Sequence, residues 1–314
     1  PRDGKVALYR RERISLLADP PEPTDELRSD PVRAALLAHL EGRGASFLVA
    51  LQAAVPSAPA AEVVAALWDL VWSGLVTNDT FQPLRGLRAK RKTPGRVTAA
   101  GGRWSLVRDL FLGRPDDTAR AHARASMVLE RYGVASGAAA RAEGLAGGFG
   151  SIYPVLKVME DAGRARRGWF VDGIDGAQFA LPGTVDRLRT HRGDDQEVTV
   201  LDAADPASPW GAVVPWGARD GAGPRRVPGA TLASVAGRPT LYVEKGERSW
   251  LVLTPDPIAV RAAILGWLGR KVDSWKTVRI ERIDGAPALD SAMCSVFLEC
   301  GFLATAGHLE RVRR

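Results

Sequence analysis

The sequence has few cysteines and no long apolar run, and each absence narrows the class of protein that it can encode. Two cysteines among 314 residues cannot form a disulfide framework, so nothing requires an oxidising compartment and we expect a cytoplasmic protein. No apolar stretch approaches the roughly 20 residues of a membrane-spanning helix, so we expect no membrane partner. The first residues include neither Met nor an apolar signal segment, which indicates a piece of a longer protein.

Motifs for several common chemistries are also missing. Neither the G-x-x-x-x-G-K-[ST] motif of a P-loop ATPase nor the G-x-S-x-G motif of a hydrolase occurs. The four histidines are scattered, and Cys294 and Cys300 would lie about 240° apart around a helix, so we expect no metal site. The glycine-rich segment 147–151 lacks a phosphate-binding lysine, and we interpret it as a turn with Ser151 as helix N-cap. Carboxylates are present, but their spacing selects no catalytic residue.

Lysine is scarce, because only seven of the 43 basic residues are lysines and the others are arginines. The net charge is +7. A basic chain dominated by arginine favours anionic partners, nucleic acid first. The charge is densest in residues 85–96, a segment without acidic residues and interrupted by glycine and proline. We predict phosphate contacts there by Arg85, Arg88, Lys90, Arg91, Lys92 and Arg96.

The clearest feature that is present is an internal repeat. Residues 31–78 and 120–172 align without a gap when one segment is shifted by 89 positions. Each copy has two glycines 30 residues apart, with apolar residues at helical spacing before the second glycine. The matched pairs are Leu40 and Leu129, Gly44 and Gly133, Val63 and Ile152, Leu67 and Leu156, Leu70 and Met159, and Gly74 and Gly163.

Each copy predicts the same three helices. The apolar spacing predicts a first helix from Asp30 in one copy and from Asp117 in the other, ended by the first glycine of the copy. A short second helix follows, with Ser46 or Ser136 as its N-cap. The third helices are expected at residues 60–73 and 151–162.

Extended segments follow the third helix in each copy. In the second copy, residues 169–171 and 178–180 predict a β-hairpin, and in the first copy residues 103–107 predict the return strand. Three short helices followed by a hairpin are the winged-helix plan. We therefore predict two winged-helix domains in tandem, at residues 28–112 and 113–190.

The third helices carry few groups that suit base recognition. In the first copy this helix has acidic residues but no Lys or Arg, and phosphates repel an acidic face. We interpret it as buried or as a self-association interface with Trp68 and Trp72 as candidate contacts. In the second copy, the segment after the helix supplies Arg164, Arg166 and Arg167, which suit DNA backbone contacts. We therefore predict binding without sequence specificity.

Residues 196–314 follow a different pattern of short alternating runs interrupted by Gly and Pro. We predict a three-stranded meander at 229–254, which with the neighbouring segments forms a small β-barrel-like α/β module, so the fold class is α+β. The further elements are expected as a helix at 257–268, a strand at 278–283, a helix at 289–299 and a last strand at 302–312. Trp210 and Trp216, in a Pro/Gly-rich loop, are candidates for stacking on unpaired bases.

Several long strings resemble one family. Residues 66–85, 102–107, 147–189, 201–216 and 301–312 are similar to the C-terminal region of bacterial large helicase-related (Lhr) proteins. The resemblance covers nearly the whole chain and implies the C-terminal end of an ATP-dependent 3′-to-5′ DNA helicase linked to DNA repair. It also implies that ATP and Mg²⁺ belong to the absent helicase core, so no cofactor is expected here. Residues 1–27 are then the end of a preceding domain.

Three functions remain open. The first is a non-catalytic DNA-binding and assembly region that binds single-stranded or tailed duplex DNA and forms homo-oligomers. The second is a DNA glycosylase, because the arrangement resembles AlkZ-type enzymes and Lhr C-terminal regions have been tied to uracil removal. The Gln-x-Gln-like pair of AlkZ-type enzymes is missing, since Gln52, Gln82, Gln178 and Gln196 are isolated. The third is an oligomerisation module without DNA affinity. Whether the chain is an enzyme is therefore open.

Overall fold

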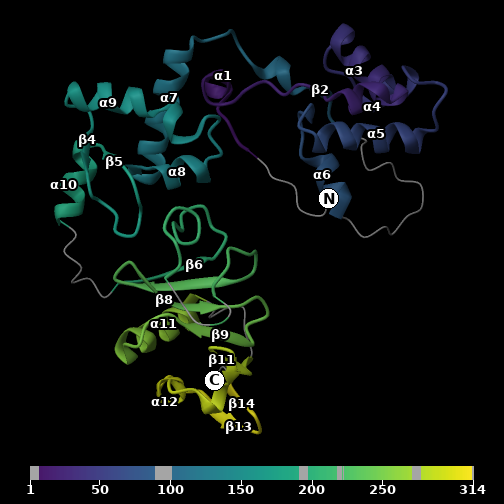
Figure 1. The fold of residues 1–314 in the computed structure, drawn as a ribbon. Coiled ribbons are helices and arrows are strands. Elements are labelled where there is room, and N and C mark those ends of the chain that lie inside the picture. Colours follow the sequence, from purple (N-terminus) through teal and green to yellow (C-terminus); the bar gives the residue numbers. More distant parts are fainter. Residues whose placement is uncertain are drawn as a thin grey trace. The chain divides into compact units, whose positions relative to one another are not determined.

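The computed structural model describes residues 7–88, 101–190, 197–217, 221, 223–270 and 277–312 (Figure 1). The chain divides into two compact units, Pro1–Arg124 and Ala125–Arg314, each of which is described by itself. None of the helices in the described ranges combines the length and the apolar character that a membrane span requires.

The first unit is built mainly of helices, with one two-stranded antiparallel sheet formed by β1 and β2. Its elements are η1 (Arg11–Arg13), α1 (Ile14–Leu17), α2 (Asp25–Ser29), α3 (Pro31–Arg43), α4 (Leu48–Ala53), α5 (Ala60–Trp72), β1 (Val76–Asn78), α6 (Gln82–Arg88), β2 (Trp104–Leu106) and η2 (Val107–Leu110). The predicted return strand at 103–107 is confirmed by β2, and the first and third predicted helices by α3 and α5.

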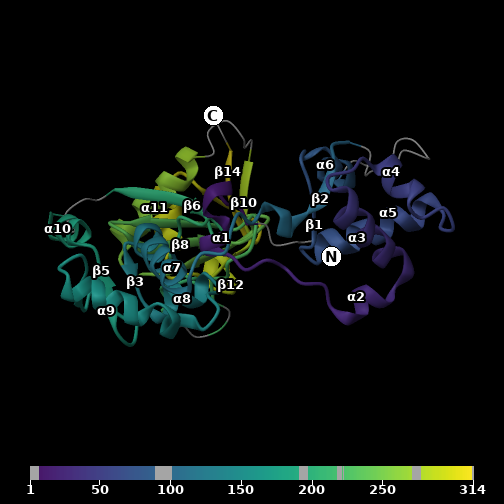
Figure 2. The same cartoon turned by 90° about the horizontal axis from the view of Figure 1, so that it is seen from above.

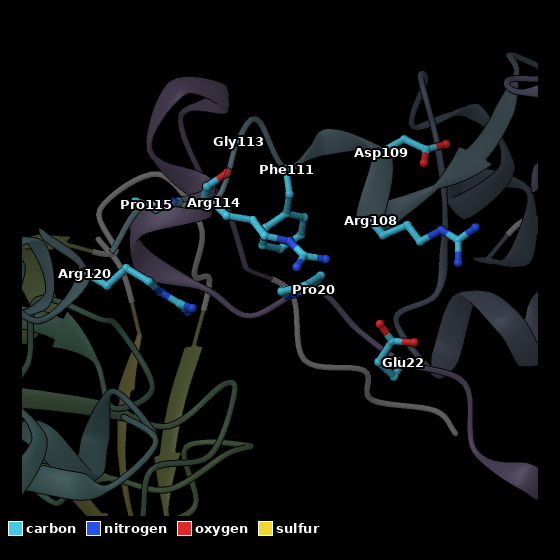
Figure 3. Close-up of a pocket in the computed structure, with 10 residues that line it drawn as sticks. Pro20, Glu22, Arg108, Asp109, Phe111, Gly113, Arg114, Pro115 and Arg120 are labelled. Carbon is cyan, nitrogen blue, oxygen red and sulfur yellow. The ribbon is translucent and has the colours of Figure 1, made fainter. Parts of the chain in front are cut away.

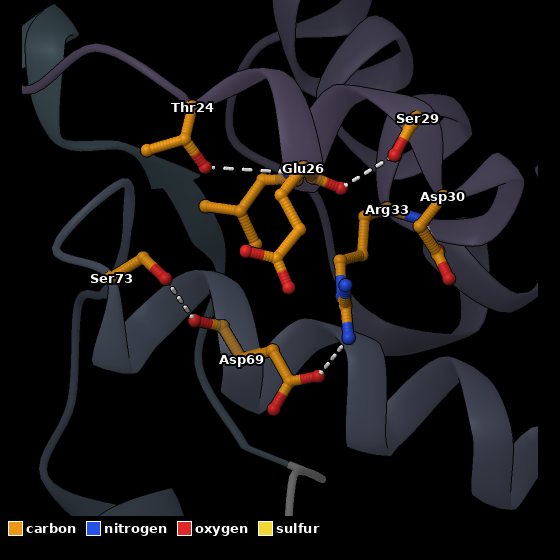
Figure 4. A network of polar contacts seen from close by, with 8 residues as sticks. Thr24, Glu26, Ser29, Asp30, Arg33, Asp69 and Ser73 are labelled. Carbon is orange, nitrogen blue, oxygen red and sulfur yellow. Dashed lines mark hydrogen bonds and ion pairs between the residues drawn. The ribbon is translucent and has the colours of Figure 1, made fainter.

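Helix α3 begins and ends for reasons that are visible in the sequence. The Asp30 carboxylate accepts a hydrogen bond from the Arg33 backbone N–H at 2.8 Å, which caps the helix, and Pro31 occupies its first turn. Gly44 ends the helix at φ +71°. The Arg33 guanidinium then reaches Asp69 on α5 at 2.7 Å, so an ion pair joins the two helices beside their shared core (Figure 4).

The second helix of the first copy starts differently from the prediction. Phe47, not Ser46, occupies the N-cap position of α4. Ser46 forms an antiparallel β-bridge with Trp104 instead, with backbone hydrogen bonds of 2.8 Å in both directions. A shift of 89 positions aligns Ser46 with Ala135, which pairs with Phe179 in the second copy. Ser46 and Ser136 are 90 positions apart, so they are not equivalent positions of the repeat.

The second copy carries the corresponding elements and a three-stranded sheet of order β3-β5-β4. Its elements are α7 (Asp117–Tyr132), β3 (Val134–Ala135), α8 (Gly137–Ala142), η3 (Gly148–Ser151), α9 (Tyr153–Asp161), β4 (Arg166–Gly168), β5 (Gln178–Ala180) and α10 (Pro182–Thr190). Ser136 caps α8 as predicted, accepting from the Ala139 N–H at 3.2 Å. Ser151 does not cap α9, because its hydroxyl donates to the Gly148 carbonyl at 2.7 Å and Ile152 occupies the cap.

The matched positions of the repeat play the same part in both copies. All four apolar pairs are buried in the cores of their copies. The four glycines have φ between +69° and +76°, a conformation that L-residues adopt only with strain. The glycines therefore fix where the helices end, and the apolar pairs fix which helix faces turn inward.

The C-terminal part of the second unit is an open sheet with α11 (Pro257–Arg270) packed on β6, β7 and β8 (Figure 2). The strand order is β12-β11-β9-β8-β7-β6, and only the β9–β11 pairing is parallel. The strands are β6 (Val198–Asp202), β7 (Thr231–Val235), β8 (Arg238–Val243), β9 (Ser249–Val252), β11 (Arg282–Ile283) and β12 (Ala286–Pro287). The meander β7–β9 and helix α11 confirm the predictions. In the described residues β12 and β6 are opposite edges of the sheet, so no closed barrel is found.

The remaining strands form a second, three-stranded sheet of order β10-β14-β13. Its strands, with the helices beside it, are β10 (Thr277–Ile280), η4 (Ala288–Asp290), α12 (Cys294–Glu299), β13 (Leu303–Thr305) and β14 (His308–Val312). The single strand predicted at 278–283 is therefore wrong, because β10 and β11 separate at Glu281 and join different sheets. The single strand predicted at 302–312 is a hairpin. Likewise, the helix predicted at 289–299 starts only at Cys294.

Candidate nucleic-acid interface

The wing of the second copy is the segment from Arg164 to Ala180. Strand β4 pairs with β5 in the register Arg166 with Ala180, Arg167 with Phe179, and Gly168 with Gln178. Because β4 lies at the edge of its sheet, one side of its backbone has no partner strand in the described residues, and the side chains of Arg166 and Arg167 are both exposed. Residues 169–171, predicted as strand, belong instead to the loop that joins β4 to β5.

Gln178 explains why the strand pairing stops after Gly168. Its side chain is fully buried, and its Oε1 accepts hydrogen bonds from the N–H groups of Phe170 at 3.1 Å and Val171 at 2.9 Å. Its Nε2 donates to the carbonyls of Val171 and Ile174, both at 2.9 Å. One side-chain amide thus replaces the partners that a longer strand would have supplied to these backbone groups.

The three arginines predicted for DNA contact are all exposed on or beside β4. Arg167 lies 3.4 Å from Glu160 of α9, a surface ion pair of little stabilising value that phosphate can replace. Arg164 and Arg166 make no ion pair within the described residues. These cations are therefore available to an anionic strand.

Trp169 follows β4 directly and is the functional candidate that sequence reasoning missed. Its side chain is 85 % exposed, the most exposed aromatic side chain among the described residues. Neighbouring residues of an extended segment point to opposite faces, so one of Trp169 and Phe170 has to face solvent. The alternation was visible in the sequence, but it could not say which of the two rings is packed. The structure packs Phe170 against Val134, Ala180 and Val185.

The exposed faces of the third helices match the sequence expectation. On α9, Lys157 and Asp161 are both exposed, so that face has no net charge. On α5, the exposed residues include Glu62 and Asp69. Neither helix presents a set of donors suited to base edges.

The basic segment at 85–96 is only partly described. Arg85 is exposed on α6, and Arg88 is the last residue of that helix. The structure thus extends helix into a segment predicted as loop. Lys90, Arg91, Lys92 and Arg96 lie outside the described residues.

The tryptophans predicted as contacts are mostly packed. Trp68 is buried and contacts the rings of Trp72 and Trp104, so it belongs to the core of the first unit and offers almost no surface to a partner. Trp72 is 40 % exposed. Trp210 and Trp216 are half-buried against the cluster around Tyr242, so both are less available for base stacking than Trp169.

A pocket of about 620 Å³ lies in the first unit (Figure 3). Its lining includes Arg108, Arg114 and Arg120, together with Glu22 and Asp109. Two of these arginines are already paired, Arg108 with Glu41 at 3.0 Å and Arg120 with Asp19. The hydrogen bond from Arg120 holds the pKa of Asp19 below its usual value. Arg120 therefore attaches the N-terminal segment, and Arg108 is paired with a residue of α3.

A partly buried carboxylate lies beside α7, but it is engaged in structural contacts. The Glu143 carboxylate accepts from Arg131 at 2.7 Å and from the Tyr132 hydroxyl at 2.8 Å. Burial, and then this hydrogen bond, raises the pKa of Tyr132 to about 12. No group of three His, Cys, Asp or Glu residues in the described part of the chain is placed to hold a metal ion.

Known proteins resemble this chain over most of its length. Residues 114–200 match the family model described as large helicase-related protein, winged-helix domain. A Mycolicibacterium smegmatis protein named "Lhr helicase/ probable uracil glycosylase" is 38 % identical over 263 residues, which cover 73 % of this chain and 17 % of that protein. An Escherichia coli K12 protein named "Lhr helicase/uracil glycosylase" is 31 % identical over an alignment of 347 residues, which covers 98 % of this chain and 22 % of that protein. The chain thus spans about a fifth of the length of these relatives.

Proposed function

Because this chain belongs to the large helicase-related (Lhr) family, we propose that it is the DNA-binding region of an Lhr-type ATP-dependent helicase that acts in DNA repair. The observation that carries the proposal is the exposed arginine edge of β4, in the domain that matches the Lhr winged-helix model. The sequence has no counterpart of the ATP-binding motif, so we assign no ATP-dependent step to these residues.

We further propose that residues 28–112 form a second winged-helix domain. The repeat, the shared burial of its apolar pairs and the bridge between Ser46 and Trp104 support this interpretation. The basic residues of segment 85–96 are then expected to contact phosphates as well. Binding by both copies is sequence-blind, since arginines beside a strand contact phosphates whereas the third helices lack base-reading donors.

The first prediction concerns salt dependence. The chain is expected to bind single-stranded and 3′-tailed duplex DNA, with an affinity that falls steeply with salt. Replacing Arg164, Arg166 and Arg167 together by Ala should reduce the log–log salt slope by about 2–3, because each phosphate contact releases nearly one counterion. Fluorescence anisotropy titrations between about 50 and 200 mM salt measure this slope.

A variant that loses the same charge elsewhere distinguishes phosphate contacts at the wing from the effect of the chain's total positive charge. Replacing Arg238 of β8, Arg282 of β11 and Arg248, which directly precedes β9 and pairs with Glu281 as Arg167 pairs with Glu160, by Ala removes the same charge from the C-terminal region. We expect this variant to keep nearly the whole salt slope. Equal losses in the two triple variants would contradict an interface at the wing, and absence of wild-type binding at low salt would refute DNA binding itself.

A second candidate function is the removal of uracil from DNA, which the names of both relatives support. A glycosylase needs a pocket for the flipped base and a group that positions water. Glu143 and Gln178 are both committed to structural hydrogen bonds, so we assign neither to catalysis. If the activity is present, incubation with a uracil-containing oligonucleotide gives alkali-sensitive breaks that a thymine control lacks. If the two oligonucleotides behave alike, this function is excluded under those conditions.

A further inference from the structure

Trp169 stands out because the wing exposes an indole that nothing in its own domain covers. A tryptophan that is 85 % exposed is uncommon, since burial of its apolar surface would stabilise the fold. Within the described residues, its exposed neighbours on β4 are arginines, not apolar side chains. A single ring beside cations differs from the contiguous apolar patch of a protein interface.

The backbone around Trp169 is held in place on both sides. The Gln178 amide fixes the backbone from Phe170 to Ile174 through four hydrogen bonds, and the Ile174 side chain is buried. On the other side, Gly168 lies against the Phe170 ring, where a Cβ would approach to 3.2 Å. The indole is therefore presented outward by a structured loop, which reduces the entropy lost when it binds a partner.

We propose that Trp169 stacks on an unpaired base of a DNA strand whose phosphates are bound by Arg164 and Arg166. This inference rests on the proposed DNA-binding function and specifies the form of DNA that the wing selects. An aromatic face accepts any base, and neighbouring cations follow the phosphate backbone, which is how sequence-tolerant single-strand binding works. In a duplex both faces of a base are already stacked, so Trp169 favours single strands and the ends of tailed duplexes.

The charged residues on either side of Trp169 indicate where a bound DNA strand lies. Asp172 and Asp175 are exposed beyond Trp169, while Arg164 and Arg166 precede it. The Asp172 carboxylate accepts from the Gly173 N–H at 3.0 Å. Acidic groups repel phosphates. We therefore expect the bound DNA to extend from the stacked base toward β4 and away from the tip of the loop.

The test compares Trp169→Ala with Trp169→Phe in the complete 314-residue chain. The alanine variant should weaken binding to a single strand by about 5- to 150-fold, the range that stacking of one base accounts for. Its affinity for a blunt duplex should be unchanged. The phenylalanine variant should recover most of the affinity, because it keeps an aromatic face. Arg166→Ala serves as the matched control, since it should weaken binding to both DNA forms.

A fluorescent base reports the stacking directly. Wild type should quench 2-aminopurine in a single-stranded oligonucleotide, and Trp169→Ala should abolish that part of the quenching. Equal weakening for single strand and duplex, or an unchanged affinity for both, would overturn the stacking proposal and leave DNA binding intact. If the alanine variant only changes the mass of the chain in solution, Trp169 is a self-association contact and the proposal fails. If wild type binds no DNA, the proposed function fails first.

Discussion

Replacing Trp250 by Ala is expected to lower the free energy of unfolding of the C-terminal sheet region by about 3–5 kcal/mol. Trp250 is fully buried on β9, and its ring centroid lies 4.8 Å from that of Trp267 and 5.5 Å from that of Phe297. Its Nε1 also donates to the Glu247 carbonyl at 2.8 Å. The substitution leaves a large cavity where α11, α12 and both sheets meet. Urea denaturation followed by near-UV circular dichroism measures the loss.

The matched control is the same substitution at an exposed site. Trp169→Ala removes an identical side chain that buries little surface, so its free energy of unfolding should stay within about 0.5 kcal/mol of wild type. If the Trp250 and Trp169 variants unfold at similar urea concentrations, the aromatic cluster does not hold the core together as the structure indicates.

The second large effect is expected from Gln178→Ala. The change removes four hydrogen bonds and leaves four backbone groups between Phe170 and Ile174 without their partner. Unsatisfied buried groups cost about 1–3 kcal/mol each, but water reaches part of this loop, so we expect a total near 2–4 kcal/mol. The wing should also lose its fixed shape, and single-strand affinity should fall as far as in Trp169→Ala. Amide hydrogen exchange at Phe170 and Val171 reports the change locally.

Gln178→Glu is the informative comparison. Its carboxylate still accepts from the two N–H groups but no longer donates to the carbonyls of Val171 and Ile174. At neutral pH we therefore expect a loss at least as large as in the alanine variant, because a charge is also buried. Protonation at low pH restores one donor and should recover part of the stability. Unaltered amide exchange in both variants would refute the role of the amide.

Local signals in the sequence were enough to predict most helices and the meander. Gly44, Gly133 and Asp30 define helix ends through backbone conformation and capping, which depend on residues close in sequence. The wrong predictions share one cause: each depends on which distant segment of the chain the residues pair with. Ser46 pairs with Trp104 rather than capping a helix, and the strand at 278–283 divides at Glu281 between two sheets. A pattern of alternating residues cannot specify its partner strand.

The exposed arginines of the candidate site could be predicted from the sequence, but the exposed side chain of Trp169 could not. Arg164, Arg166 and Arg167 are polar, and polarity alone implies exposure. Aromatic residues give no such indication: the sequence leaves Trp68 either buried or at an interface, and it is buried, whereas it predicts Trp169 in a strand, and the ring is exposed beside one. The difference is set by the packing of Phe170 and by the Gln178 amide, neither of which a local pattern reveals.

The division of the chain at Glu281 also determines how this region can form during synthesis. Strand β11 has to insert beside β9, after α11 has already been made, and β14 then pairs with β10 to complete the second sheet. The aromatic cluster needs Phe297 and Phe302, which leave the ribosome late. Helix α11 covers part of the meander before then, but Trp250 lacks its contacts with Phe297 and Phe302 until both residues have been made.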